Sequence, residues 1–145
     1  IVLLSRRHAD KKSGKLVLVD AGKGGVGATS VVAALGEAML DSGRRVALLD
    51  LDIATQDLSR FLQARPFVNE SLQLLLEGSR PFGGDLVDEC AVRVWHDEER
   101  LVCVPPPPDN DRTAPLDASH QRAFLSLLEA LDERYDVVLV DLAGV

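Results

Sequence analysis

Residues 22–30 read Gly22-Lys23-Gly24-Gly25-Val26-Gly27-Ala28-Thr29-Ser30. This segment follows a short apolar run at residues 16–19 and precedes a stretch whose apolar residues recur at helical spacing. Glycines at such a junction let backbone N–H groups turn inward around an anion, and the helix that follows adds the positive end of its dipole. The segment therefore predicts a phosphate-binding loop between a first strand and a first helix.

Two phosphate-binding motifs fit these residues. Gly22, Gly24 and Gly27 match G-x-G-x-x-G, the dinucleotide fingerprint, with an acidic residue at the end of the second strand. Gly22, Gly27 and Thr29 match G-x-x-x-x-G-K-[ST], the phosphate loop of nucleoside triphosphatases, in which Ala28 replaces the usual lysine. A glycine turn with no ligand is the third interpretation.

Three polar side chains favour a nucleoside triphosphate. A triphosphate needs a cation on its phosphates and a hydroxyl on magnesium, and the loop offers Lys23, Thr29 and Ser30. The dinucleotide interpretation leaves Asp52 and Asp141 unexplained. From residue 24 onward every basic side chain is an arginine, so the one lysine in the loop favours a specific phosphate contact over a solvated surface charge.

Four apolar runs predict the strands of one sheet. They are residues 16–19, 46–49, 101–104 and 137–140. None alternates with polar residues, which is typical of strands covered on both faces in a parallel sheet. Residues 91–95 and 101–104 are expected to form a hairpin that adds an antiparallel edge strand.

The segments between the runs predict helices. One covers residues 29–42 and ends at Gly43, a second is capped by Asn69 and ends at Gly78, and a third begins after Asp117. Together with the strands they predict an α/β fold, a mostly parallel sheet sandwiched by helices.

Three predicted strands are followed by an aspartate, namely Asp20, Asp50 and Asp141. Ligands of open parallel sheets bind beyond the carboxyl ends of the strands. A turn explains Asp20, which precedes the glycine loop, so Asp50 and Asp141 are the better candidates for binding.

Composition limits the class of protein. The chain has 145 residues, of which 46% are hydrophobic and 27% are charged, which suits one folded domain with no stretch of about 20 apolar residues. Residues 1–15 are basic, whereas the other 130 residues hold 11 basic and 22 acidic side chains. An acidic body is a poor nucleic-acid surface, so DNA is not an expected partner. The two cysteines, Cys90 and Cys103, are too few for a disulfide framework or a zinc site, and we expect a cytoplasmic protein in which Cys103, inside an apolar run, is a buried thiol.

Residues 23–30 resemble the deviant Walker A motif, KGGVGK[ST][ST], of the ParA/MinD superfamily of P-loop ATPases. Residues 46–52 look like the Walker A′ strand of that family, and residues 137–141 look like its Walker B strand. The motifs come in family order and the resemblance covers residues 15–145. It implies ATP and Mg²⁺ as ligands and an ATP-sandwich homodimer as the active assembly.

The resemblance also implies roles for single residues. Lys23 would reach the phosphates of the partner subunit, and Asp52 would position or activate the attacking water. Thr29 would bind Mg²⁺ directly, Asp141 would bind it through water, and Asp50 would support the metal shell. The residues that would contact the nucleotide are Gly22, Lys23, Gly24, Gly25, Val26, Gly27, Ala28, Thr29, Ser30, which would hold the α-phosphate, and Gly144, which would sense the γ-phosphate.

Ala28 departs from the family pattern, because most members have a lysine there. The variant KGGVGA[ST][ST] resembles the CpaE/TadZ branch, which localises the machinery of Flp-type pilus assembly at the cell pole. By that resemblance, residues 1–15 are a basic linker or the end of a receiver-like domain, and residues 16–145 are the N-terminal portion of a P-loop ATPase domain.

The expected function is an ATP-dependent dimerising switch with weak or slow ATPase activity that positions a pilus or secretion assembly machine. Its partners would be pilus or secretion assembly proteins, and the resemblance allows peripheral membrane association at the pole. The alternatives are a MinD-like or flagellar-number regulator, or a nucleotide-binding scaffold that is not an enzyme.

Overall fold

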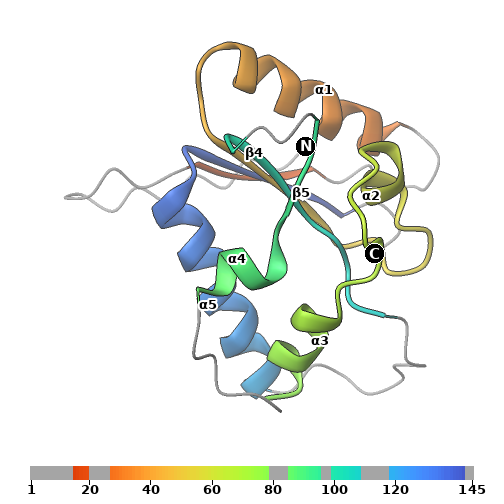
Figure 1. Ribbon diagram of the computed structural model, residues 1–145, viewed down its shortest axis with the longest axis vertical. Coiled ribbons are helices and arrows are strands. Elements are labelled where there is room, and N and C mark those ends of the chain that lie inside the picture. Colours follow the sequence, from red (N-terminus) through yellow and green to blue (C-terminus); the bar gives the residue numbers. More distant parts are fainter. Residues whose placement is uncertain (1–14, 20–26, 79–84, 96–98, 109–117, 143–145) are drawn as a thin grey trace.

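The computed structural model describes residues 15–19, 27–78, 85–95, 99–108 and 118–142. Helices lie on both faces of a five-stranded sheet (Figure 1). The elements in chain order are β1 (Lys15–Val19), α1 (Ala28–Asp41), β2 (Val46–Asp50), α2 (Asp57–Phe61), α3 (Glu70–Leu76), α4 (Leu86–Cys90), β3 (Val92–Arg93), β4 (Leu101–Val104), α5 (Ala118–Arg134) and β5 (Val137–Asp141).

The strands lie in the order β1-β5-β2-β4-β3. All neighbours are parallel except β3 and β4, which form the predicted antiparallel edge. The predicted α/β architecture, a mostly parallel sheet sandwiched by helices, is therefore confirmed. Because β5 lies between β1 and β2, the carboxyl ends of these three strands lie side by side at one edge of the sheet.

Two hydrophobic clusters cover the two faces of the sheet. Val46 and Leu48 of β2 point into the cluster under α1 and α2, and Ala47 and Leu49 point into the cluster under α3, α4 and α5. This alternation follows from the period of two along a strand. Every residue of β2, β4 and β5 is buried, which explains the uninterrupted apolar runs in the sequence.

Local chemistry ends the helices where the sequence predicts. Gly43 has φ +83°, and the N–H groups of Gly43 and Arg44 donate to the carbonyls of Leu40 and Met39, which is a Schellman motif at the end of α1. The side chain of Asn69 accepts from the N–H of Leu72 at the start of α3. Asp117, the expected cap of α5, lies outside the described residues.

The two shortest helices, α2 and α4, are absent from the sequence prediction. Each has five residues, too few to establish an apolar period. The other predicted elements agree with the structure to within two residues at each end, and the first strand of the edge hairpin is shortened from residues 91–95 to Val92–Arg93. Within the described residues, no helix has the length and apolarity needed to cross a membrane.

Candidate functional site

The candidate site lies at the carboxyl edge of the sheet, where α1 begins and β5 ends. Gly27 adopts φ +86° and immediately precedes α1, and its carbonyl accepts from the N–H of Val31. The first N–H groups of an α-helix have no acceptor within the helix, so they favour an anion. The left-handed conformation at Gly27 suits a glycine, because a Cβ would be strained there.

A hydrogen bond joins the two ends of the site. The hydroxyl of Thr29, in the first turn of α1, donates to Oδ2 of Asp141 at 2.7 Å across 112 residues of sequence. Asp141 is the last residue of β5 and is fully buried. A hydroxyl and a carboxylate are the hard oxygen ligands that Mg²⁺ prefers. This pair fits a magnesium ion that is bound together with substrate phosphates.

Asp50 is the neighbour of Asp141 in the parallel register of β2 and β5. Its carboxylate is fully buried and accepts from the N–H of Asp52 at 3.0 Å. It also accepts from the N–H of Ser59 at 2.8 Å and from the Ser59 hydroxyl at 2.6 Å. Burial raises the pKa of Asp50 above its usual value, although the bonds from Ser59 oppose that shift. Asp50 thus ties α2 to the end of β2.

Asp52 lies two residues beyond the end of β2 and is 5% exposed. Its Oδ1 accepts from the N–H groups of Ala54 at 3.2 Å and Thr55 at 3.0 Å. Its Oδ2 accepts from the Thr55 hydroxyl. These bonds hold the carboxylate in the turn that connects β2 to α2, at the same edge of the sheet as Thr29 and Asp141.

The structure therefore brings together part of the predicted site. Thr29, Asp50, Asp52 and Asp141 lie at one edge, and Ser30 is an exposed residue of the first turn of α1. Ala28 is 8% exposed and packs with the core cluster under α1. The other predicted site residues lie outside the described residues, and they are Gly22, Lys23, Gly24, Gly25, Val26 and Gly144.

Ser59 is a residue of the site that the sequence analysis does not identify. It is fully buried and supplies two of the three hydrogen bonds to Asp50. Nothing in its local sequence marks it, because its role depends on the way α2 packs against β2. Among the described residues, no group of three or more His, Cys, Asp or Glu side chains could hold a metal ion without other ligands.

Comparisons with known proteins find similar sequences and similar folds. The ParA family model, described as NUBPL iron-transfer P-loop NTPase, matches residues 12–83. The septum site-determining protein MinD of Synechocystis is 27% identical over 132 residues, which are 88% of this chain and 44% of that protein. The chain thus spans less than half the length of this curated relative.

Solved structures share the fold. The cell division ATPase MinD of Pyrococcus furiosus has a TM-score of 0.67 at 25% identity, covering 91% of this chain and 52% of that one. Cobyrinic acid a,c-diamide synthase of Mycobacterium smegmatis, solved with a bound ATP analogue and magnesium, has a TM-score of 0.68 at 29% identity, covering 88% and 50%. The sheet and helices of this chain match those of the MinD/ParA P-loop NTPases.

Proposed function

We propose that this chain is a P-loop NTPase of the ParA/MinD superfamily and that it binds ATP together with Mg²⁺ at the carboxyl edge of its sheet. The observation that carries the proposal is the 2.7 Å hydrogen bond between the Thr29 hydroxyl and Asp141. Thr29 and Asp141 would hold Mg²⁺, and Ser30 with the glycine loop of residues 22–27 would hold the phosphates. Bound Mg²⁺ would neutralise charge on the phosphate oxygens.

In this proposal Asp50 has a structural role in place of the metal-shell role that the family resemblance implies. All three of its hydrogen bonds go to donors of the chain, so its contribution is to fix α2 and the turn that carries Asp52. Asp52 is held by donors on Ala54 and Thr55 in that turn. We assign it the orientation of the attacking water, in a weak or slow ATPase.

Equilibrium binding tests the nucleotide site. Thr29→Val removes the hydroxyl without changing the shape of the side chain, and Asp141→Asn removes the charge. Each variant should weaken MgATP binding by at least about tenfold, because it loses a contact to a charged group. Matched controls are Ser42→Ala at the other end of α1 and Asp136→Asn just before β5, both of which should bind MgATP as the wild type does. Unchanged affinity in Thr29→Val and Asp141→Asn would refute the site.

The hydrolysis step requires a separate measurement. Asp52→Asn and Lys23→Ala should lower the rate of phosphate release while MgATP still binds, and Asp57→Asn, an exposed carboxylate at the start of α2, should not. A wild-type protein that binds MgATP but releases no phosphate would favour the alternative of a scaffold that is not an enzyme. Ala28 supports that alternative, because it removes the usual charged contact to the phosphates.

Dimerisation on ATP is the proposed output of the site. By the resemblance of residues 23–30, Lys23 acts on the nucleotide of a second subunit. The molecular mass should therefore double with MgATP and remain that of a monomer with MgADP. Lys23→Ala should abolish the doubling, whereas Arg122→Ala, an exposed position on α5, should not.

The process served by the switch is proposed from Ala28 and from the relatives. Ala28 favours positioning of a pilus or secretion assembly machine at the cell pole, with assembly proteins as partners and peripheral attachment to the membrane. The similarity to MinD proteins favours a MinD-like spatial regulator of division as the second candidate. Deletion of the gene distinguishes them, since loss of pili with normal septa supports the first and misplaced septa support the second.

A further inference from the structure

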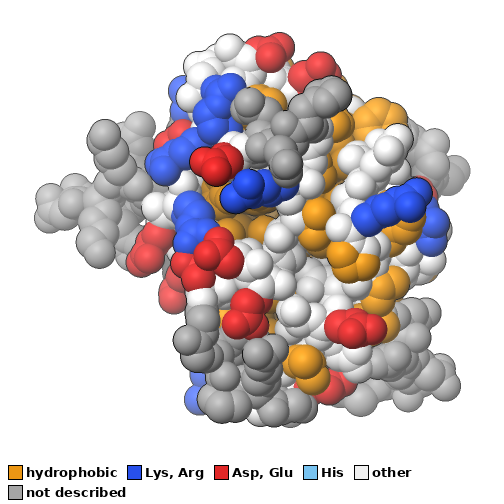
Figure 2. Space-filling view, in the orientation of Figure 1, with side chains coloured by type: hydrophobic (Ala, Val, Ile, Leu, Met, Phe, Trp, Pro, Cys, Tyr) orange, Lys and Arg blue, Asp and Glu red, His pale blue; other side chains and the backbone are white. Residues whose placement is uncertain are grey.

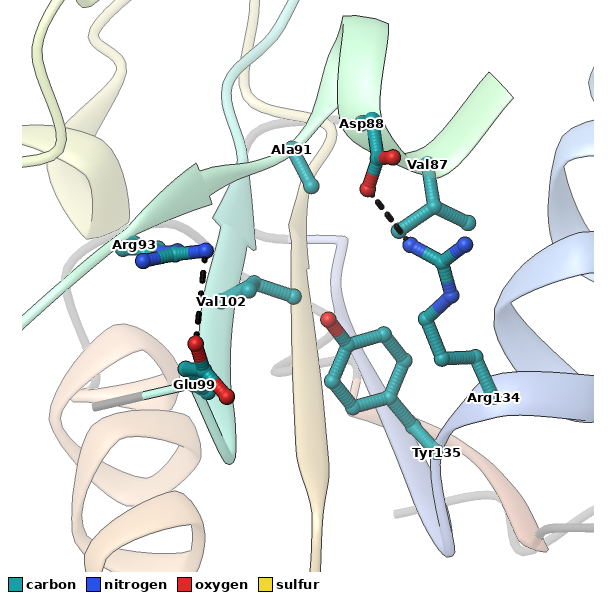
Figure 3. A pocket seen from close by; sticks show the side chains of 8 residues that line it. All are labelled: Val87, Asp88, Ala91, Arg93, Glu99, Val102, Arg134 and Tyr135. Atoms are coloured by element: carbon teal, nitrogen blue, oxygen red, sulfur yellow. Dashed lines mark hydrogen bonds and ion pairs between the residues drawn. The ribbon is translucent and has the colours of Figure 1, made fainter. Parts of the chain in front are cut away.

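A second feature of the molecule lies far from the nucleotide edge. A cavity of about 380 Å³ opens between α4, the strands β3 and β4, and the end of α5 (Figure 3). It lies toward the amino ends of the strands, on the sheet face opposite α1. Its volume falls in the range of small-molecule sites, roughly 300–1,000 Å³. We refer to it as the Tyr135 cavity, and the proposed function gives it no role.

Tyr135 supplies an unpaired polar group to this cavity. The residue is 5% exposed, and Figure 3 shows its hydroxyl pointing between Val87 and Val102. Among the residues that the structure describes, none forms a hydrogen bond with that hydroxyl. The hydroxyl is open to the space of the cavity, because among the described residues no side-chain polar atom sealed from solvent lacks a hydrogen-bond partner. Burial also raises the pKa of Tyr135, so the hydroxyl keeps its proton at neutral pH and can donate it.

Two arginines flank the cavity, and they differ in how fully they are engaged. Arg134 pairs with Asp88 at 2.6 Å and also with Asp85. Arg93 forms a single ion pair with Glu99 at 3.6 Å, between side chains that are 57% and 80% exposed. Such an exposed pair contributes little and can be exchanged for another anion. Arg93 therefore has more guanidinium N–H groups available for a ligand than Arg134 has.

Figure 2 shows this face of the molecule, where acidic and basic side chains surround an area of hydrophobic atoms. The hydrophobic atoms of the lining belong to Val87, Ala91 and Val102. The Tyr135 hydroxyl and the Arg93 guanidinium therefore offer unused donors beside these three apolar side chains. The acidic side chains in its wall would repel a doubly charged phosphate more strongly than a singly charged group.

We propose that the Tyr135 cavity binds a carboxylate carried on a short aliphatic chain. The Tyr135 hydroxyl and the Arg93 guanidinium donate to the carboxylate, and Glu99 gives up its place on Arg93. Val87, Ala91 and Val102 contact the aliphatic chain. The carboxylate can belong to a free aliphatic acid or to an acidic side chain of a partner protein.

Titration with small probes, followed by nuclear magnetic resonance, tests this proposal on the whole protein. Butyrate should shift the resonances of the cavity residues with a dissociation constant in the millimolar range, and butyramide and butylammonium should bind at least about fivefold more weakly. Tyr135→Phe and Arg93→Gln should each weaken butyrate binding at least about fivefold. Arg45→Gln is the matched control, because Arg45 forms a similar exposed ion pair with Asp136 at 3.5 Å outside the cavity.

Two outcomes would overturn the proposal. One is equal butyrate affinity in the wild type, Tyr135→Phe and Arg93→Gln, and the other is tighter binding of butylammonium than of butyrate. The amide-blocked glutamate N-acetylglutamate α-amide separates the two sources of the carboxylate. If this compound binds more tightly than butyrate, the natural ligand is an acidic side chain of a partner protein. If it binds more weakly, the natural ligand is a free aliphatic acid. Affinity for MgATP, measured on the same variants, should be unchanged, which shows that they fold and keeps this test separate from that of the nucleotide site.

Discussion

At the scale of single residues, Ala28 combines two features, since it packs in the core where the family motif has a charged lysine. It is the first residue of α1, and its methyl group packs with the core cluster that contains Val17 and Val32. A P-loop lysine at this position would place a positive charge on the phosphates. Loss of such a contact is worth roughly 1.5–3 kcal/mol.

Restoring that charge is therefore informative. Ala28→Lys should tighten MgATP binding by about tenfold or more, because its aliphatic stem can follow the packed surface while the ammonium reaches the phosphates. Isothermal titration calorimetry measures the change. Ala38→Lys, on an exposed position of the same helix, is the control and should have no effect. Equal affinities for wild type and Ala28→Lys would mean that the loop of this chain binds phosphate in another way.

Ser59 should prove structurally important at its buried position. Ser59→Ala removes the 2.6 Å bond to Asp50 and leaves that buried carboxylate with two backbone donors. We expect the free energy of unfolding to fall by about 1–3 kcal/mol, measured by urea denaturation. Ser126→Ala, which removes an exposed hydroxyl on α5, should cost less than about 0.5 kcal/mol. A similar small loss for both variants would contradict the role given to Ser59.

The buried thiol of Cys90 should make the free energy of unfolding depend on pH. Burial raises the pKa of Cys90 from 9.0 to about 11, so the unfolded chain ionises this thiol at lower pH than the folded chain does. The buried, protonated thiol therefore contributes fully to the free energy of unfolding below pH 9. This contribution, about 1–3 kcal/mol, is lost as the pH rises toward 11. Under reducing conditions, Cys90→Ala should show a smaller decline in unfolding free energy over this interval than the wild type. An identical decline would show that Cys90 ionises normally.

At the scale of elements, the sequence predicts the sheet well and the short helices poorly. Fully buried strands leave long apolar runs, and α1 and α5 leave a helical period, so these elements can be read from their own residues. The helices α2 and α4 are stabilised by tertiary contacts, which leave no pattern in their own residues. Asp50 ends a buried strand and can therefore be predicted from the sequence, whereas its partner Ser59 lies in α2 and cannot.

Asn69 is the residue that most clearly joins two elements. Its Oδ1 caps α3 through the N–H of Leu72, and its Nδ2 donates to the carbonyl of Cys90 at the end of α4 at 2.7 Å. Asn69→Ala should lower the free energy of unfolding by about 2–3 kcal/mol, because it removes a cap and leaves a buried carbonyl unpaired. Gln73→Ala, which removes only an exposed bond to Glu77, should cost less than about 0.5 kcal/mol. Comparable costs in the two variants would argue against a joint role for Asn69.

At the scale of the whole molecule, the parallel sheet separates two kinds of chemistry. Its carboxyl edge gathers the Thr29–Asp141 pair and the turn that holds Asp52. The Tyr135 cavity lies toward the amino ends of the strands. The sequence predicts the first site because strand ends and the glycine loop are local signals. It does not predict the second, because Arg93, Tyr135 and the apolar side chains of the lining come from four separate elements or their ends and meet only in the fold.

The central claim is that the carboxyl edge of the sheet binds a magnesium nucleoside triphosphate. An equilibrium titration of the whole protein with MgATP, MgADP and NAD tests it most directly. We expect saturable binding of MgATP and MgADP, weakened when EDTA removes the magnesium, and no binding of NAD. Binding of NAD without MgATP, or the absence of binding of any of the three, would contradict it.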